Sequence, residues 1–300
     1  MAALRNRTLG NRGELNVIPF AGKPPRSLLD QYRHPRSSPA PRADPGSDRR
    51  AGFGYVAPWR RDLQGRTPGQ VRRHLRDAGL KVNAYCRSTF IPAATRQGFD
   101  AALADNFRAI EEAAELHAQS FIMVVGSLPD GSRDLSAARD QVAEGLARLL
   151  EHARQHQVSL ALEPLHPMYA ADRSCLSTLE QALDLCDMLE PGTCHSLGVA
   201  VDVYHCWWDP KLHEQIHRAG AQKRILGLHL SDWLVPTRDL LLDRGMMGDG
   251  VIDLRGIRQQ VEAAGYDGAI EVEIFSRDTW WRRDEADVLH TCAERLQGCC

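Results

Sequence analysis

The sequence contains no apolar run that approaches the roughly 20 residues needed to span a membrane, and no signal-like apolar stretch near residue 1. It therefore predicts no membrane association. Its eight cysteines include no C-x-x-C pair and no regular spacing, and most lie in apolar segments. We expect reduced thiols in a cytoplasmic protein rather than a disulfide framework.

A large excess of positive charge is also missing. The 37 Lys and Arg residues, only four of them Lys, face 39 Asp and Glu residues, for a formal net charge of −2. This balance predicts no nucleic-acid partner. With 300 residues and 43% hydrophobic residues, the chain suffices for one large α/β barrel or two ordinary domains.

From residue 52 onward, short apolar runs alternate with longer amphipathic ones. The first pair is "GFGYVAP" and "TPGQVRRHLRDAG", and six more such pairs follow. Near-continuous apolar strands are typical of a parallel sheet that helices cover. Seven units in a row favour a (β/α)8 TIM barrel over an open doubly wound sheet, so we predict this α/β fold for residues 51–300.

Residues 1–50 differ from the rest of the chain. They hold seven of the 16 prolines and a local charge of +6, and we interpret them as a Pro/Arg-rich irregular segment. "ELNVIPFAG" (14–22) could be the first strand, but the prolines after it prevent a long helix, so the first βα unit is expected to be irregular or degenerate. A disordered segment, a targeting peptide, and an incorrect start or frame error are alternatives.

Four late strands each end in a side chain that can bind a metal. They are separated by 39, 27 and 44 residues, about one strand–helix unit each, and are Glu163, Asp202, His229 and Glu273. Because chemistry in such barrels lies at the carboxyl ends of the strands, the four can converge at one mouth. Three carboxylates and one imidazole suit one Mn²⁺, Mg²⁺ or Co²⁺ ion, and Zn²⁺ also fits. Each residue alone could instead be a buried, satisfied polar group.

Neighbouring polar residues can be sorted by strand alternation. Glu271 and Glu273 point to one face, and Glu273, nearer the carboxyl end, is the predicted ligand. His205 follows Asp202 by three residues and would turn over the mouth to touch substrate. Asp232 follows His229 at the same spacing and could orient its imidazole, or could be a helix cap.

A glycine-rich loop, "DRGMMGDGVIDL" (243–254), follows the predicted seventh strand. Arg244 in this loop offers a planar donor for substrate hydroxyls or a carboxylate, although the loop could also be an ordinary turn. Tryptophans after the sixth and eighth strands, Trp207 among them, could wall the pocket or simply pack.

Over residues 52–290 the chain resembles the xylose isomerase-like TIM barrels, which include ketose epimerases, hydroxypyruvate isomerases and inosose-processing enzymes. The segments that carry the resemblance are "LEPLHP", "DVYH", "HLSDW", the 243–254 loop and "VEIF", in that order. The resemblance implies that Glu163, Asp202, His229 and Glu273 bind one divalent metal and that His205 and Arg244 contact substrate. It also implies a small sugar-like substrate, and family members are often dimers or tetramers.

The implied reaction is α-proton abstraction beside a carbonyl, through a metal-stabilised enediolate, with Glu163 and Glu273 as the catalytic proton-transfer groups. The result would be an isomerase or epimerase acting on a sugar, polyol or keto acid. An inosose-type dehydratase and a catalytically inactive barrel are the alternatives.

The sequence also departs from parts of the family. Tyr169 stands where the epimerases have a further glutamate, while "EPLHP" resembles the inosose-type members and makes His166 a pocket residue. Leu165 replaces the lysine of dual-metal xylose isomerases. Apurinic endonucleases share the barrel but bind three zincs through extra histidines that are missing here, which argues against a nuclease.

Overall fold

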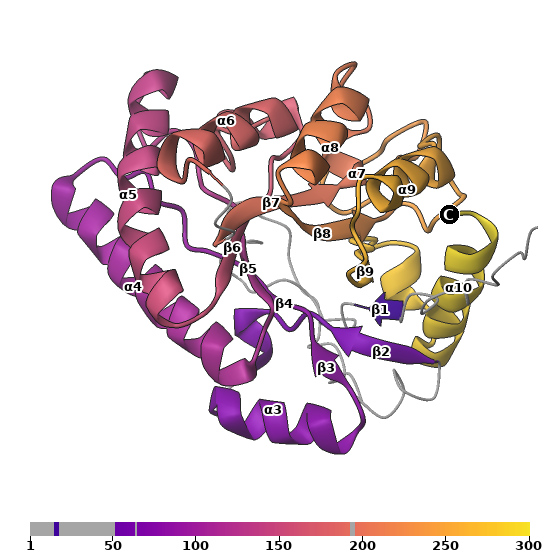
Figure 1. Ribbon diagram of the computed structural model, residues 1–300. Helices are drawn as coiled ribbons and strands as arrows, with labels where there is room; N and C mark the ends of the chain where they lie inside the picture. The colour runs from indigo at the N-terminus through magenta and orange to yellow at the C-terminus, as the bar shows by residue number, and fades with distance from the viewer. Residues whose placement is uncertain (1–14, 18–51, 64, 193–195) are drawn as a thin grey trace, which may run out of the picture.

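The computed structural model describes residues 15–17, 52–63, 65–192 and 196–300 of the chain. Its strands form one parallel sheet that curves into a barrel (Figure 1). In chain order the strands are β1 (Leu15–Val17), β2 (Phe53–Val56), β3 (Lys81–Val82), β4 (Ala84–Tyr85), β5 (Ser120–Met123), β6 (Ser159–Leu162), β7 (Leu197–Asp202), β8 (Ile225–Leu230) and β9 (Ile270–Val272).

The barrel closes at Asn83, the single residue between β3 and β4. Its backbone N–H donates to Val56 O at 3.0 Å, and its carbonyl accepts from Gln119 N at 2.9 Å. β3 pairs with β2, and β4 pairs with β5, so the two short strands are one barrel strand with an interruption. The nine strands in the described ranges thus form the eight strands of a (β/α)8 TIM barrel, as the alternation of apolar runs predicts.

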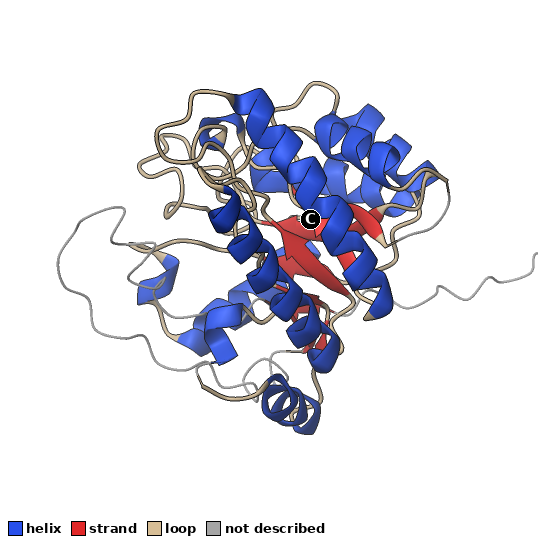
Figure 2. Ribbon diagram, turned by 90° about the vertical axis from the view of Figure 1, so that its left-hand side faces the viewer, coloured by secondary structure: helices blue, strands red, loops and turns tan. Residues whose placement is uncertain are grey.

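Helices cover the outside of the sheet (Figure 2). The α-helices are α3 (Pro68–Asp77), α4 (Arg96–Leu116), α5 (Leu135–Gln155), α6 (Leu179–Leu189), α7 (Val203–Cys206), α8 (Leu212–Ala221), α9 (Leu254–Ala263) and α10 (Glu285–Gly298), and the 3-10 turns are η1 (Arg60–Leu63), η2 (Pro167–Tyr169) and η3 (Trp280–Arg282). Local sequence explains their starts: Thr67, Thr95 and Thr178 each accept a backbone N–H as N-cap. All seven predicted units are present.

The predicted first strand exists, but it is short. β1 lies between β2 and β9 and is parallel to both, which is the place of a first barrel strand. Residues 1–14 and 18–51, where the irregular first βα unit was predicted, lie outside the described residues. The boundary at residue 51 therefore stays a prediction.

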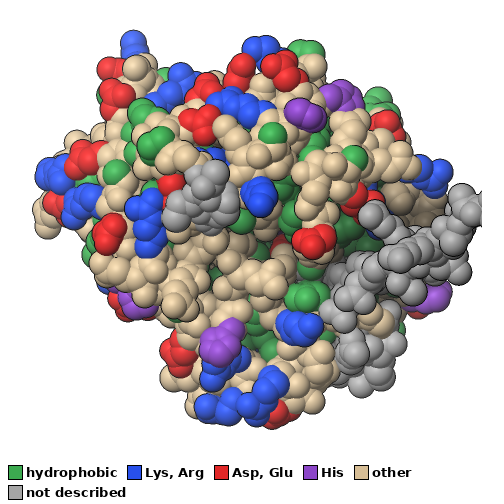
Figure 3. Space-filling model, in the orientation of Figure 1, with side chains coloured by type: hydrophobic (Ala, Val, Ile, Leu, Met, Phe, Trp, Pro, Cys, Tyr) green, Lys and Arg blue, Asp and Glu red, His purple; other side chains and the backbone are tan. Residues whose placement is uncertain are grey.

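Charges of both signs on the surface and buried thiols are in line with the composition of the chain. Basic and acidic side chains are interspersed on the face that Figure 3 shows. The seven cysteines in the described part of the chain are all free, and five of them are buried. None of the helices in the described ranges combines the length and apolar character that a membrane crossing needs.

Candidate metal centre

Four side chains predicted from the strand ends meet at the mouth of the barrel. One oxygen or nitrogen of each lies within 4.8 Å of the others, and the four are Glu163, Asp202, His229 and Glu273. All are buried, with 7%, 2%, 1% and 7% of their surface exposed, respectively. The structure thus brings together the whole set that the sequence predicts as metal ligands.

Strand register places these side chains. Asp202, the last residue of β7, is paired with His229 of β8. Glu163 directly follows β6, and Glu273 directly follows β9, where its N–H donates to Leu230 O at 2.9 Å. Because the sheet order is β9-β8-β7-β6, the two glutamates flank the aspartate and the histidine.

A short helical turn brings Asp202 and His205, which are three residues apart, to the same face. β7 ends at Asp202, whose Oδ1 accepts from Tyr204 N at 2.9 Å and caps α7. Residues three apart on a helical turn share one face, so His205 Nε2 lies 3.6 Å from Asp202 Oδ2. The predicted turn over the mouth is present, and it begins directly after Asp202.

Arg244 contacts two of the four candidate ligands and the neighbouring His205. One of its nitrogens, Nη1, donates to Asp202 Oδ2 at 2.9 Å and to Glu273 Oε2 at 3.1 Å, and Nη2 donates to His205 Nε2 at 3.0 Å. Its guanidinium lies 4.4 Å from the Tyr204 ring centroid. The loop that carries Arg244 therefore delivers a buried cation to the candidate ligands.

Burial and mutual charge shift the pKa values of these groups in opposite directions. Burial raises the pKa of Glu273, and Glu163 and Asp202 add to this, so it reaches about 8 despite Arg244. For Asp202, Arg244 and the two imidazoles outweigh burial and lower the pKa to about 2. Burial lowers the pKa of His205 to about 3. The site therefore contains more carboxyl groups than its own positively charged side chains can neutralise.

The donor set fits a divalent cation. Burial, together with the charges of Glu163 and Asp202, raises the pKa of Glu273 to about 8, so further positive charge would be stabilising there. Three carboxylates and one imidazole supply oxygen-rich ligands from four different strands. Glu163, Asp202, His229 and Glu273 are the residues that would hold the ion.

His229 has a second carboxylate behind it. Its Nδ1 faces Glu163 Oε1 at 2.9 Å, whereas its Nε2 lies 3.6 Å from Glu271 Oε2 deeper in the barrel. Asn83 Nδ2 holds the other oxygen of Glu271 at 2.6 Å. Burial lowers the pKa of His229, but Glu271 and Glu163 outweigh this and raise it to about 10. Glu271, and not Asp232, is therefore the carboxylate that lies behind the imidazole.

Asp232 instead organises the glycine-rich loop. Its carboxylate accepts from Gly248 N at 3.0 Å, Gly250 N at 2.8 Å and Ile252 N at 3.1 Å. A side chain at residue 250 would place its Cβ 2.3 Å from Trp233 O, so this close approach requires glycine. The suggestion that Asp232 orients the imidazole is wrong, because its oxygens are committed to loop amides.

The two remaining predicted substrate contacts, His166 and Trp207, lie around this centre. The backbone nitrogen of His166 is 3.3 Å from His205 Nδ1, and its ring stacks on Trp233 at 5.0 Å. Burial lowers the pKa of His166. The Trp207 ring also packs on Trp233, at 5.7 Å. Their contact with substrate stays a prediction.

Sequence reasoning missed several neighbours of the site. Asn83 is one, because only barrel closure brings it to Glu271, 188 residues away. Tyr204 and Phe275 are others, and both of their rings face Arg244. A signal for the two aromatic residues was present, since each stands two positions after a predicted strand-end ligand, but aromatic residues there are equally typical of packing.

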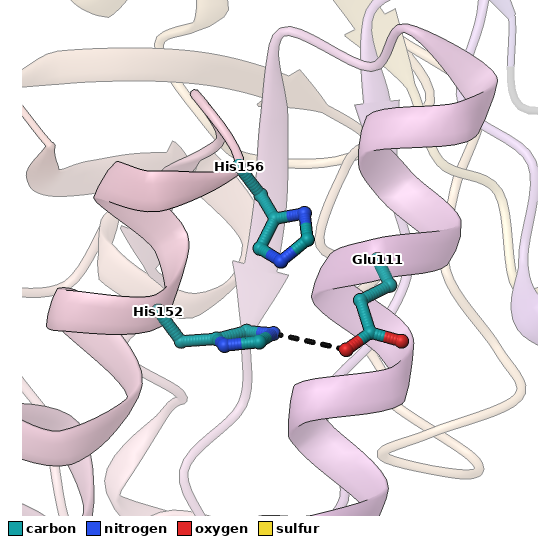
Figure 4. A group of neighbouring side chains, drawn as sticks. All are labelled: Glu111, His152 and His156. Carbon is teal, nitrogen blue, oxygen red and sulfur yellow. Dashed lines mark ion pairs between the residues drawn. The ribbon is translucent and has the colours of Figure 1, made fainter.

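A second group of possible donors lies far from the mouth, on the outer helices (Figure 4). Glu111 of α4 faces His152 of α5, with 3.2 Å between Oε1 and Nε2, and His156 follows at the end of α5. One donor atom of each lies within 4.8 Å of the others. The Glu111 side chain is 52% exposed, unlike any member of the central group.

The fold and this centre define a (β/α)8 barrel with a candidate metal site at the carboxyl ends of its strands. The family described as xylose isomerase-like TIM barrel matches residues 49–292. The chain belongs to that family. No curated protein matches the sequence closely enough to count as a relative.

Solved structures include several similar barrels. A protein from Sinorhizobium meliloti 1021 is 54% identical, with a TM-score of 0.81 over 85% of this chain and 91% of that one. The IolI protein, whose structure contains a zinc atom, is 15% identical with a TM-score of 0.73 over 95% and 97% of the two chains. An L-ribulose 3-epimerase is 17% identical with a TM-score of 0.71 over 95% and 93%.

Proposed function

We propose that the chain is a divalent-metal-dependent isomerase or epimerase that acts on a sugar or a sugar-like keto compound by proton transfer beside a carbonyl. The observation that carries this proposal is the buried group of Glu163, Asp202, His229 and Glu273, whose donors lie within 4.8 Å of one another. Membership of the xylose isomerase-like family, and neighbours that include an epimerase and a zinc-containing barrel, support it.

A divalent ion held there would polarise the substrate carbonyl and stabilise the negative charge that develops on its oxygen. The chain itself would move the protons. Glu163 and Glu273 flank the ligand pair on the outer strands of the four, so they can reach a substrate carbon from two sides. A carboxylate beside the substrate carbon can accept a proton from it and return one to it.

Other residues would hold the substrate and exclude water. Arg244 and His205 lie in mutual contact at 3.0 Å, and both offer hydrogen bonds to hydroxyl groups. The Tyr204 and Phe275 rings around Arg244 form an apolar wall, which strengthens polar interactions inside the pocket.

The test is substrate α-proton exchange in deuterated water, with Mn²⁺-loaded protein and a panel of keto sugars and inososes. We expect Glu273→Gln to abolish exchange because the amide cannot take up the proton, whereas Glu262→Gln on the exposed face of α9 should exchange as the parent does. Exchange retained in Glu273→Gln would contradict the role of that glutamate. Release of water during the reaction would assign a dehydratase instead.

A further inference from the structure

Two arginines at the mouth of the barrel lie over rings of one apolar cluster. The guanidinium carbon of Arg87 is 4.7 Å from the Phe90 ring centroid, and that of Arg173 is 5.4 Å from the Tyr169 ring centroid. Phe90 and Tyr169 both belong to the small cluster that includes Val124 and lies apart from the main core. The aromatic faces hold the two cations in place on this common base.

The two guanidinium groups are close enough to repel each other. Burial lowers the pKa of Arg87 to about 10, and the positive charge of Arg173 is the next largest cause. Two cations that repel each other in a partly buried mouth are destabilising by themselves. An anion between them would reverse this effect.

A third arginine joins them from the neighbouring segment. Arg60 N donates to Cys86 O at 2.7 Å, so the residues that follow this bonded pair, Arg61 and Arg87, lie on adjacent segments. The Arg61 guanidinium stands over the Trp59 ring at 4.4 Å. Arg61 lies in η1 after β2, Arg87 lies two residues after β4, and Arg173 lies beyond η2 in the segment after β6, so all three belong to segments that follow strands of the barrel.

These cations lack strong carboxylate partners. Within the described ranges, no hydrogen bond joins any of the three to a carboxylate, and the ion pairs of Arg61 and Arg173 are 3.9 Å contacts with their chain neighbours Asp62 and Asp172. The Nε atoms of Arg61 and Arg173 are buried without a hydrogen-bond acceptor among those residues. Such groups are costly to bury unless a ligand satisfies them.

The cluster adjoins the candidate metal centre. The Tyr169 ring, on which Arg173 stands, meets the His205 ring edge-on at 5.9 Å. His205 Nε2 is in turn 3.6 Å from Asp202 Oδ2. A small molecule that reaches the candidate ligands can therefore also reach these arginines.

We propose that Arg87 and Arg173, with Arg61 beside them, bind an anionic group of the substrate, either a phosphate or a carboxylate. Guanidinium groups present paired N–H donors that match both kinds of anion. This inference rests on the proposed function, because it takes the bound anion to be part of the substrate. It narrows the substrate class to sugar acids and sugar phosphates.

The test measures anion binding by calorimetry in the presence of chelator, so that no metal contributes. Inorganic phosphate and D-gluconate are the two probes, and tighter binding of one assigns a phosphate ester or a sugar acid. We expect Arg87→Gln and Arg173→Gln each to weaken binding about tenfold or more. Arg173→Lys, which keeps the charge but loses the paired donors, should bind with intermediate affinity.

Arg96→Gln is the matched control. Arg96 stands over Phe99 at the same 4.7 Å, but its side chain is 61% exposed and paired with Glu144. Circular dichroism checks that each variant is folded. Parent protein that binds neither probe would overturn the proposal, as would equal binding by the parent and both glutamine variants. A failure of proton exchange with anion binding intact would instead overturn the proposed function alone.

Discussion

The central group at the strand ends and the surface group on α4 and α5 contain similar donors but have opposite surroundings. The central four are at most 7% exposed, whereas Glu111 of the surface group is about half exposed. Water can solvate and screen the surface donors, so they need no ion. The central carboxylates have lost that water, and burial together with the neighbouring carboxylates raises the pKa of Glu273.

The comparison teaches that donor type and separation do not by themselves define a functional site. Both groups have donor atoms within 4.8 Å, yet only the central one places three carboxylates beside a further carboxylate and an arginine in a buried mouth. A metal is thus expected to bind tightly at the centre and weakly at the surface. The three predictions below test this difference.

The largest effect is expected from Asp202→Ala. Substitution of a residue that contacts a metal ligand, but not the metal, typically weakens metal binding about 10–100-fold. Loss of one of the four ligands themselves should weaken binding by more than that. Metal content after Mn²⁺ loading and dialysis, measured by elemental mass spectrometry, should fall from about one ion per chain to background. His156→Ala should retain the ion.

Asp202→Asn provides a check on folding, because its amide oxygen can still cap α7. Retention of a full metal equivalent in both Asp202 variants would show that the central group is not the tight site.

A smaller effect is expected for the pH dependence of stability in metal-free protein. The pKa of Glu273 rises from 4.5 in the unfolded chain to about 8 in the folded one. The folded state therefore retains a proton that the unfolded state loses, and the free energy of unfolding decreases as pH rises from about 4.5 to 8. The full shift corresponds to at most about 5 kcal/mol. His229, whose pKa rises from 6.5 to about 10, acts in the same direction above pH 6.5.

Urea unfolding with chelator at several pH values measures this dependence. Glu273→Gln should flatten the profile chiefly between pH 5 and 6.5, where His229 is protonated in both states. Glu262→Gln should leave the profile unchanged. A parent-like slope in Glu273→Gln would mean that this carboxyl group is already ionised in the folded protein.

The smallest effect is expected at the surface group. In an Asp202→Ala background, which lacks the central site, His156→Ala should weaken Zn²⁺ binding by about tenfold and change stability by no more than about 0.5 kcal/mol. Zinc titration by calorimetry measures the first change, and urea unfolding the second.

His213→Ala is the control, because His213 and His217 on α8 have the same i,i+4 spacing as His152 and His156. In the described part of the chain, His213 and His217 form no three-donor group. An equal loss in His213→Ala would show that helical histidine pairs, rather than Glu111, explain the surface binding.

The sequence alone was sufficient to predict the barrel and the candidate ligands, because both predictions depend on the order of strands and helices along the chain. Each apolar run carries its own strand signal, and parallel strands bring their carboxyl ends to one mouth. Glu163, Asp202, His229 and Glu273 could thus be predicted without knowledge of packing. Asp232 could not be assigned correctly, because its partners Gly248, Gly250 and Ile252 depend on the path of a loop.

The sequence by itself determined the alternation of elements, the four strand-end donors and the near-neutral charge. Only the tertiary structure decided that Asn83 holds Glu271 beside His229, that Arg244 bridges Asp202 and Glu273, and that Arg87 and Arg173 stand over rings of one apolar cluster. The physical reason is distance along the chain. Strand and helix patterns arise from neighbours in sequence, whereas these contacts join residues that only barrel closure and loop packing bring together.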